Sequence, residues 1–276
     1  MLSYLHAFHA GNFADVQKHA VQVLTLIMLQ AKPSPIACFD THAGSAVYDL
    51  DSERARKTGE AETGIQRLWQ QRRELAAGDW KRLLETLGAI SGEDNRIARY
   101  PGSPEWFRRY LRDQDTLTVF ELHPAEKQSL AAWAPRSVRV CQEDGLKGLL
   151  RQLPPRQPRL LVLMDPSYEV KSDYQVVADT LIKAWQKCRH GVYLIWYPLL
   201  PEQQHQKLLD TLCKSQVRKI LKSELTLSNP PPRGMTGSGM LIVNPPWGLD
   251  ARLESMLGEA AQCLDAQHRT DWLVPE

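Results

Sequence analysis

The sequence lacks the cysteine pattern of a zinc site or of a disulfide framework. Its five cysteines are odd in number and widely spread, and no two of them form a C-x-x-C pair; they are Cys38, Cys141, Cys188, Cys213 and Cys263. This distribution favours reduced thiols and a cytoplasmic location. No other cluster of ligand residues stands out, so we expect no metal.

The sequence also lacks a membrane-spanning run, a signal peptide and a strong excess of charge. The apolar segment from Val21 to Leu29 is too short to cross a bilayer, and no basic region with a cleavage site precedes it. The net charge is +2, so charge alone gives no strong argument for a nucleic-acid partner. A length of 276 residues with 43% hydrophobic residues suits one large α/β domain, or such a domain with an insertion.

A short apolar run that stops at an acid is the most informative stretch. Leu160 to Met164 is bounded by turn residues, which indicates a buried parallel strand, and Asp165-Pro166-Ser167-Tyr168 follows it. Ligands of open α/β sheets bind at the carboxyl ends of strands. There, Asp165 and the carbonyl of Pro166 can accept both N–H bonds of an exocyclic amine, and Tyr168 offers a face for a base. This fits a flipped adenine, although an isolated motif of this kind is also compatible with an ordinary strand-end turn.

Alternating strands and helices predict a doubly wound α/β sheet. We expect strands at 36–40, 116–121, 138–141, 160–164 and 191–197, and two later strands at 218–225 and 240–243. The first strand leads into Thr41-His42-Ala43-Gly44, which lacks the full G-x-G-x-x-G fingerprint and is compatible with an adenosine ligand other than a dinucleotide. Glu121 and Asp144 follow later strands, where one acid suits a ribose and the other an adenine edge.

The N-terminus is crowded with aromatic and imidazole groups. Tyr4, His6 and His9 lie within the first nine residues. A helix is expected to start at Asp15 and to end before Pro33, with Lys18 and His19 in its first turns. Each of these two side chains has an ordinary interpretation, as a solvated lysine and a packed histidine.

Residues 46–98 are predicted to form a helical insertion, because the next strand ending in an acid comes only at Glu121. Basic residues of this segment could contact a phosphate backbone or simply be solvated. After the insertion, Ser103 is expected to cap a helix with Pro104 in its first turn. The glycine-rich loop 229–239 carries Arg233 and suits a mobile segment that faces substrate.

Asn244-Pro245-Pro246-Trp247 is a competing amine-binding motif. It follows an apolar strand and has a second proline, so its residue types suit the task better than those after Met164. Its position is less suitable, because no glycine turn and pair of acids precede it in the expected order. We therefore favour Asp165 and interpret Asn244 as part of a rigid connection between a strand and a helix.

Together these motifs resemble one family over essentially the whole chain. They are L-S-Y-x-H-x-F-H-A-G-N at 2–12, K-H at 18–19, F-D-T-H-A-G at 39–44, Y-P-G-S-P at 100–104, E-L-H-P at 121–124, D-G at 144–145, D-P-x-Y at 165–168, W-Y-P at 196–198, R-G-M-T-x-S-G-M at 233–240, N-P-P-W at 244–247 and the terminal V-P-E. The chain resembles the RlmJ-type 23S ribosomal RNA adenine-N6 methyltransferases, whose members have also been labelled as proteins for use or catabolism of external DNA.

The resemblance implies a Rossmann-like, S-adenosylmethionine-dependent methyltransferase domain, residues 1–45 and 99–276, with the insertion at 46–98. It implies methylation of N6 of one adenine in 23S rRNA, as protein-free RNA or an early assembly intermediate, by a cytoplasmic monomer. Carried over by position, the catalytic residues would be Asp165 and Lys18. The cofactor would contact His19, His42, Ser103, Glu121, Asp144, Gly145 and Asp165, and the substrate would contact Tyr4, His6, Pro166, Tyr168 and Arg233.

The chain departs from the family pattern at Ser167, where the family has a second proline. Serine frees φ and restores an N–H, so we expect a less rigid loop and a slower enzyme. The turn Ser45-Ala46-Val47 also departs slightly from the pattern. Two alternatives remain open at this stage: a DNA adenine-N6 methyltransferase, and a catalytically weak nucleic-acid-binding protein involved in the use of external DNA.

Overall fold

A single mixed sheet organises the chain. The computed structural model describes residues 4–92 and 95–276. Its eight-stranded sheet has the order β10-β8-β9-β7-β6-β1-β4-β5. The strands are β1 (Ile36–Asp40), β4 (Thr116–Phe120), β5 (Val138–Cys141), β6 (Arg159–Met164), β7 (Val192–Leu199), β8 (Ile220–Leu227), β9 (Gly237–Val243) and β10 (Ala266–Val274). The neighbouring strands β7, β6, β1, β4 and β5 pair in parallel, whereas β9 is antiparallel to both β7 and β8. This confirms the expected Rossmann-like α/β fold.

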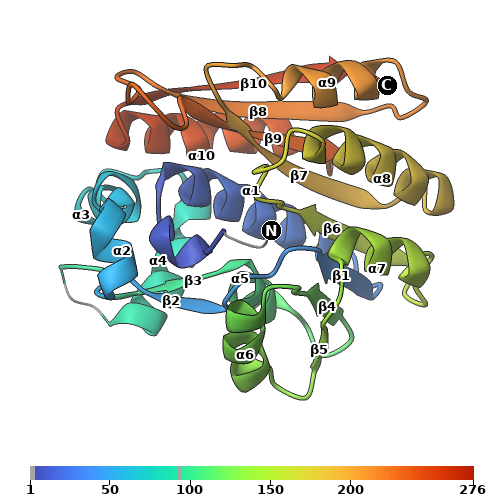
Figure 1. The fold of residues 1–276 in the computed structure, drawn as a ribbon, viewed down its shortest axis with the longest axis horizontal. Helices are drawn as coiled ribbons and strands as arrows, with labels where there is room; N and C mark the ends of the chain where they lie inside the picture. The colour runs from blue at the N-terminus through green and yellow to red at the C-terminus, as the bar shows by residue number, and fades with distance from the viewer. Residues whose placement is uncertain (1–3, 93–94) are drawn as a thin grey trace.

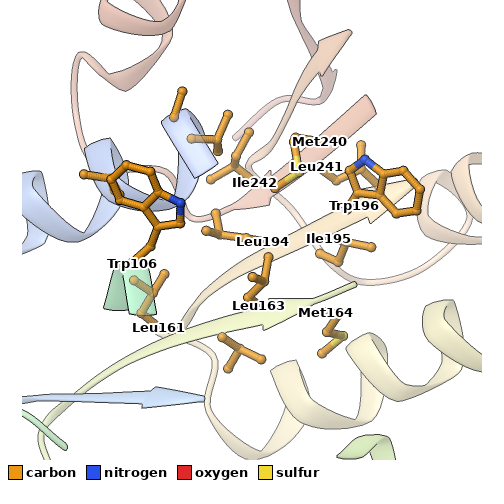
Figure 2. Packing of buried hydrophobic residues seen from close by; sticks show 14 of the residues in the cluster. Trp106, Leu161, Leu163, Met164, Leu194, Ile195, Trp196, Met240, Leu241 and Ile242 are labelled. Carbon is orange, nitrogen blue, oxygen red and sulfur yellow. The ribbon is translucent and has the colours of Figure 1, made fainter. Parts of the chain in front are cut away.

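The centre of the sheet is apolar on both faces, as expected for parallel strands covered by helices. Every residue of β1 is buried, and so is β6 from Leu160 to Met164. Figure 2 shows side chains of β6, β7 and β9 packed side by side, among them Leu163, Leu194 and Ile242. β1 and β6 are therefore buried up to their carboxyl ends.

Helices cover both faces of the sheet (Figure 1). They are α1 (Phe13–Leu29), α5 (Ser103–Tyr110), α6 (Pro124–Trp133), α7 (Gly145–Gln152), α8 (Asp173–Lys187), α9 (Gln206–Cys213) and α10 (Leu249–Cys263). α1 packs against α5, α10 and β9, whereas α8 packs against α7 and α9. Within residues 4–92 and 95–276, no helix combines the length and the hydropathy that a membrane span requires.

The long connection between β1 and β4 includes residues 46–98, which were predicted to form a helical insertion. It holds α2 (Glu53–Thr58), the π-helical turn η2 (Glu62–Gln66), α3 (Arg67–Gln70) and α4 (Gly78–Ser91). It also holds a strand that was not expected, β2 (Val47–Asp49), which pairs with β3 (Arg99–Pro101). Tyr48 and Tyr100 lie opposite each other in this two-stranded ribbon. The segment is therefore mainly helical and is closed by a short ribbon.

Two helix starts differ from the sequence prediction. α1 begins at Phe13 rather than at Asp15, because the side chain of Asn12 accepts the amide of Asp15 and caps the helix. The N-cap of α5 is Gly102 and not Ser103, which is the first helical residue. In both cases the cap lies slightly upstream of the predicted position.

The C-terminal segment and the glycine-rich loop also differ from expectation. Residues 266–274 form the edge strand β10, which the sequence did not predict. Its residues are mostly half-buried or exposed and include Gln267, Arg269 and Asp271, and its only apolar run is Trp272-Leu-Val at the end, so the pattern does not reveal the whole strand. The loop expected at 229–239 is shorter, because β9 already begins at Gly237.

Candidate active site

Asp165 lies at the mouth of a large cavity at the carboxyl ends of the parallel strands. It is the first residue after β6 and borders a cavity of about 490 Å³. The cavity extends along the ends of β1 and β4 and is bordered on another side by the N-terminal segment that includes η1 (His6–Phe8). This is the position at which open α/β sheets bind ligands.

A buried ion triad joins Asp165 to helix α1. The ammonium of Lys18 donates to Oδ2 of Asp165 at 2.6 Å and lies 2.8 Å from Oδ1 of Asp15. The side chains of Lys18, Asp15 and Asp165 are only 5%, 1% and 13% exposed. One ammonium therefore serves two carboxylates in a region that little solvent reaches.

The same triad holds the N-terminal segment. Oδ2 of Asp15 accepts from Nε2 of His6 at 2.9 Å and from the amide of Gly11 at 2.8 Å. Nδ1 of His6 lies 2.8 Å from the hydroxyl of Tyr4, which completes the chain if His6 donates from Nε2 and accepts at Nδ1. A continuous series of hydrogen bonds thus leads from Tyr4 to Asp165.

Burial and pairing oppose each other within the triad. Burial raises the pKa of Asp165, and the neighbouring Lys18 acts in the opposite direction. Burial would also raise the pKa of Asp15, but His6 and Lys18 outweigh it and hold that pKa well below its usual range. For Lys18, burial lowers the pKa, and the two carboxylates more than offset this and raise it. Lys18 is therefore firmly protonated.

The glycine turn after β1 is bonded to Glu121. Gly44 has φ +56, and a Cβ there would lie 2.4 Å from the hydroxyl oxygen of Tyr48, so the turn requires glycine. The carboxylate of Glu121 accepts the amide of Gly44 at 2.7 Å and the amide of His123 at 2.6 Å. Its pKa is raised mainly by burial. The amide of Leu122 adds a third bond, and the carboxylate keeps an acceptor position for a ligand hydroxyl.

Two histidines at the cavity are held neutral. Burial lowers the pKa of His42 to about 4 and that of His19 well below its ordinary value. Nδ1 of His19 lies 2.8 Å from the hydroxyl of Tyr100. Its Nε2 is buried without a hydrogen-bond partner among the described residues, which leaves one polar atom for a ligand.

Asp40, the last residue of β1, is a buried acid that the sequence reasoning did not select. It is fully buried, and its Oδ2 has no hydrogen-bond partner in the part of the chain that the structure describes. Burial raises the pKa of Asp40 to about 7. Asp40 does not line the large cavity, so it is a buried acid next to the site and not part of the cavity wall.

Most of the predicted site residues meet at this cavity. Those that line it are Tyr4, His6, Lys18, His19, His42, Ser103, Glu121, Asp165, Pro166 and Tyr168. Asp144 and Gly145 do not line it, but they lie close by, because Gly145 packs against the backbone of Thr41. Arg233 is exposed and away from the cavity wall, whereas Met235 of the same loop reaches it.

Tyr168 is held more tightly than the sequence suggested. Its φ is +53, its hydroxyl donates to the carbonyl of Trp196 at 2.8 Å, and its ring stacks on Tyr174 with the centroids 4.4 Å apart. The ring is only 6% exposed. Tyr168 therefore forms a fixed part of the cavity wall, with one face already covered.

Sequence reasoning missed several lining residues. They include His9, Asn12, Asp15, Tyr48, Glu126 and Trp196. His9 stacks on Tyr4 with a centroid distance of 5.5 Å, and its Nδ1 lies 2.7 Å from the carboxylate of Glu60 in the insertion. For Asp15 a signal was present, because it stands three residues before Lys18 on one helix and the two therefore share a face.

The competing motif lies elsewhere. β9 is antiparallel to β7, so its carboxyl end lies beside the start of β7 rather than beside its end. The side chain of Asn244 donates to the carbonyls of Arg189 and Gly191, both at 2.8 Å. Asn244 does not line the large cavity.

Charge in the cavity is strongly negative. Six acidic residues line it, namely Asp15, Glu121, Glu126, Asp165, Glu169 and Asp173, against the single lysine Lys18. Such a wall suits a ligand that carries positive charge or a neutral base and disfavours a phosphate. The described residues contain no group of three His, Cys, Asp or Glu side chains placed to hold a metal ion.

Comparison with known proteins agrees with this geometry. Residues 33–274 match the family described as ribosomal RNA large subunit methyltransferase D, RlmJ. The chain is 41% identical to ribosomal RNA large subunit methyltransferase J of Escherichia coli and 37% identical to the protein of the same name from Haemophilus influenzae, over 100% of each chain. The crystal structure of protein LPL1258 from Legionella pneumophila superposes with a TM-score of 0.89 at 31% identity, covering 96% of this chain and 98% of that one. The chain belongs to the RlmJ family of ribosomal RNA large subunit methyltransferases.

Proposed function

We propose that the protein transfers a methyl group from S-adenosylmethionine to N6 of one adenine in 23S rRNA. The observation that carries the proposal is the position of Asp165, which follows β6 directly and faces a cavity that the N-terminal segment borders. The proposal includes action as a cytoplasmic monomer on protein-free rRNA or on an early assembly intermediate.

The residues at the glycine turn suit the cofactor. Glu121 can accept a ribose hydroxyl, because a carboxylate has about four acceptor positions and the amides of Gly44, His123 and Leu122 occupy three of them. The buried Nε2 of His19, which lines the cavity, lacks a partner among the described residues and is available to a polar group of a ligand. The acidic wall favours a cation. S-adenosylmethionine, when bound, supplies an activated methyl group on a positively charged sulfonium.

Asp165 is suited to orient the target amine. Its Oδ2 is occupied by Lys18, whereas Oδ1 has no bond to any described residue and can accept one N6–H. The carbonyl of Pro166 is the second acceptor. Holding both hydrogens directs the nitrogen lone pair toward the methyl donor, so positioning provides much of the acceleration. Asp165 need not act as a strong base, since the N6 proton becomes acidic only once the new C–N bond has formed.

The test is methyl transfer from labelled S-adenosylmethionine to protein-free 23S rRNA, followed by identification of the modified atom. Asp165→Ala should abolish labelling and still bind cofactor in a thermal-shift assay. Asn244→Ala is a matched control, because Asn244 also precedes a proline after a strand but lies beside the start of β7, at the opposite ends of the parallel strands. Its labelling should persist. Labelling of DNA in place of RNA, or equal labelling by Asp165→Ala, contradicts the proposal.

A further inference from the structure

A second cavity lies on the other face of the β2–β3 ribbon. It has a volume of about 360 Å³, and its walls are Val47, Ala89, Ile90, Arg99, Glu105, Arg108, Arg109, Trp133 and Pro135. Tyr48 of the ribbon lines the large cavity, whereas its neighbour Val47 lines this one. Successive residues of a strand point to opposite faces, so the ribbon separates the two cavities by its own thickness.

The charge of the second cavity is opposite to that of the first. Three arginines and one carboxylate line it, which gives a net charge of about +2, whereas the large cavity has six acids and one lysine. The whole chain has a net charge of only +2, so this arrangement is a local separation of charge. An anion is therefore attracted to one side of the ribbon and repelled from the other.

Glu105 orients two of the arginines. It is 3% exposed, and its oxygens accept two bonds from Arg108 and one from Arg109, each at 2.7 Å. The indole N–H of Trp133 adds a fourth bond at 2.8 Å. A buried carboxylate that is saturated in this way fixes the guanidinium groups and competes little for a further ligand.

Several guanidinium donors remain free. Within residues 4–92 and 95–276, Nη1 of Arg108, both Nη atoms of Arg109 and the whole guanidinium of Arg99 have no hydrogen-bond partner. Each of the three side chains is partly exposed at the cavity. Glu105 fixes the planar groups of Arg108 and Arg109, and their free N–H edges match the geometry of a phosphate.

We propose that this second cavity binds a phosphodiester group of the RNA next to the adenine held in the large cavity, with Arg99, Arg108 and Arg109 as its ligands. The inference rests on the proposed function and adds how the backbone is held while only a neutral base enters the acidic cavity. α5 borders both cavities. Gly102 and Ser103 at its start line the large cavity, and Arg108 and Arg109 near its end line the second one.

The double variant Arg99→Gln/Arg109→Gln tests the site and keeps Arg108 on Glu105, so that no buried charge is left unpaired. The dissociation constant for 23S rRNA should rise about 10-fold at 0.1 M salt. The slope of the logarithm of the association constant against the logarithm of the salt concentration, which is negative, should become shallower by about 1 to 2. The kcat at saturating RNA and the affinity for S-adenosylmethionine should stay as in the wild type. Arg218→Gln/Arg269→Gln removes the same charge near β8 and β10, at the far end of the sheet, and should change the RNA constant less than 2-fold.

The outcomes separate this site from the proposed function. If the wild type methylates rRNA and the double variant binds RNA as tightly as the wild type, or no more weakly than the control, the second site is refuted alone. If no methylation occurs but RNA binding depends on Arg99 and Arg109, the proposed function fails and the site stands. If millimolar inorganic phosphate raises the Tm of the wild type but not of the double variant, and RNA affinity is the same for both, the cavity binds small anions and the RNA assignment is wrong.

Discussion

The ammonium of Lys18 lies 2.6 Å from Oδ2 of Asp165, although the two residues are 147 positions apart in the chain. Lys18 also contacts Asp15 at 2.8 Å, and Asp15 in turn holds His6. Asp15 is therefore a positioning residue: it touches no reacting atom in the proposed reaction but fixes the cation beside Asp165. The N-terminal segment and the acid after β6 are thus parts of one electrostatic unit.

Lys18→Met should strongly impair both stability and catalysis. It leaves two buried carboxylates without their shared cation, and breaking a buried ion pair in this way costs on the order of 3–5 kcal/mol. Loss of the cation removes the factor that opposes burial at Asp165, so its pKa should rise. We expect kcat/KM to fall about 100-fold or more and its acidic limb to move to higher pH, as measured by pH-rate profiles and denaturant unfolding.

Lys57→Met provides the control for that variant, because Lys57 is an exposed lysine of α2. It should leave the pH profile unchanged. A second double variant, Asp15→Asn/Lys18→Met, removes one of the two orphaned charges and should recover part of the lost stability without recovering the rate. If Lys18→Met unfolds at the wild-type denaturant concentration, the triad contributes no net stability and the argument is wrong.

Ser167→Pro should make the enzyme faster and more stable. The amide of Ser167 donates no hydrogen bond to any described residue, so proline would remove no contact there. Proline at a compatible position stabilises by about 0.4–1 kcal/mol, because the unfolded chain loses freedom. A stiffer loop should hold Asp165 and Tyr168 in place. We expect a several-fold increase in the rate constant of methyl transfer, measured under single-turnover conditions.

Ser167→Ala separates stiffness from the loss of the hydroxyl. Alanine keeps the N–H and the freedom of φ, so its rate should equal that of the wild type. An unchanged or lower rate for Ser167→Pro would show that the loop is already rigid enough, as the bond from Tyr168 to Trp196 would permit.

The parts of the site that could be predicted have local signals. An apolar run that stops at an acid marks Asp165 because strand burial and strand ends can be read within a few residues. The same logic located β1 and β4 with their polar ends. Asp15 was interpreted only as a helix start, because its role depends on a contact with a residue in another element. β10 was missed for a different reason: it is an edge strand with polar side chains, and pairing with β8 rather than its own pattern defines it.

Asp40→Asn should flatten the pH dependence of stability. Burial raises the pKa of Asp40 to about 7 in the folded protein from its ordinary value of 3.8. For an acid whose folded pKa is raised, the folded state holds more protons than the unfolded state between these two values. The contribution of Asp40 to stability is therefore greatest below about pH 4 and is lost as pH rises from about 4 through about 7. The loss over this whole range is on the order of 4 kcal/mol, because each pKa unit corresponds to about 1.4 kcal/mol.

Urea unfolding at pH 5 and at pH 8 measures this effect. The wild type should lose stability between the two values by more than Asp40→Asn does. Asp210→Asn, at a solvent-exposed position of α9, controls for the loss of one negative charge. Identical pH dependence in the wild type and Asp40→Asn would mean that Asp40 is ionised in the folded protein throughout this range.

Gly145→Ala tests the packing behind the part of the cavity that is proposed to bind the cofactor. A Cβ at residue 145 would lie 1.9 Å from the carbonyl oxygen of Thr41, which is backbone and cannot rotate away. Either the start of α7 or the turn before His42 must shift, and overpacking of this kind costs about 1–3 kcal/mol. We expect a lower Tm and a raised KM for S-adenosylmethionine, with a smaller change in kcat.

Gly258→Ala is the matched control, because a Cβ at Gly258 in α10 meets no atom within 4 Å. Alanine is the better helix former there, so this variant should gain about 0.5–1 kcal/mol. The two substitutions add the same methyl group, and their opposite signs would isolate the contact with Thr41 as the cause. A Gly145→Ala protein with wild-type Tm and KM would show that the turn adapts at no cost, and the close approach of α7 would then have no part in shaping the site.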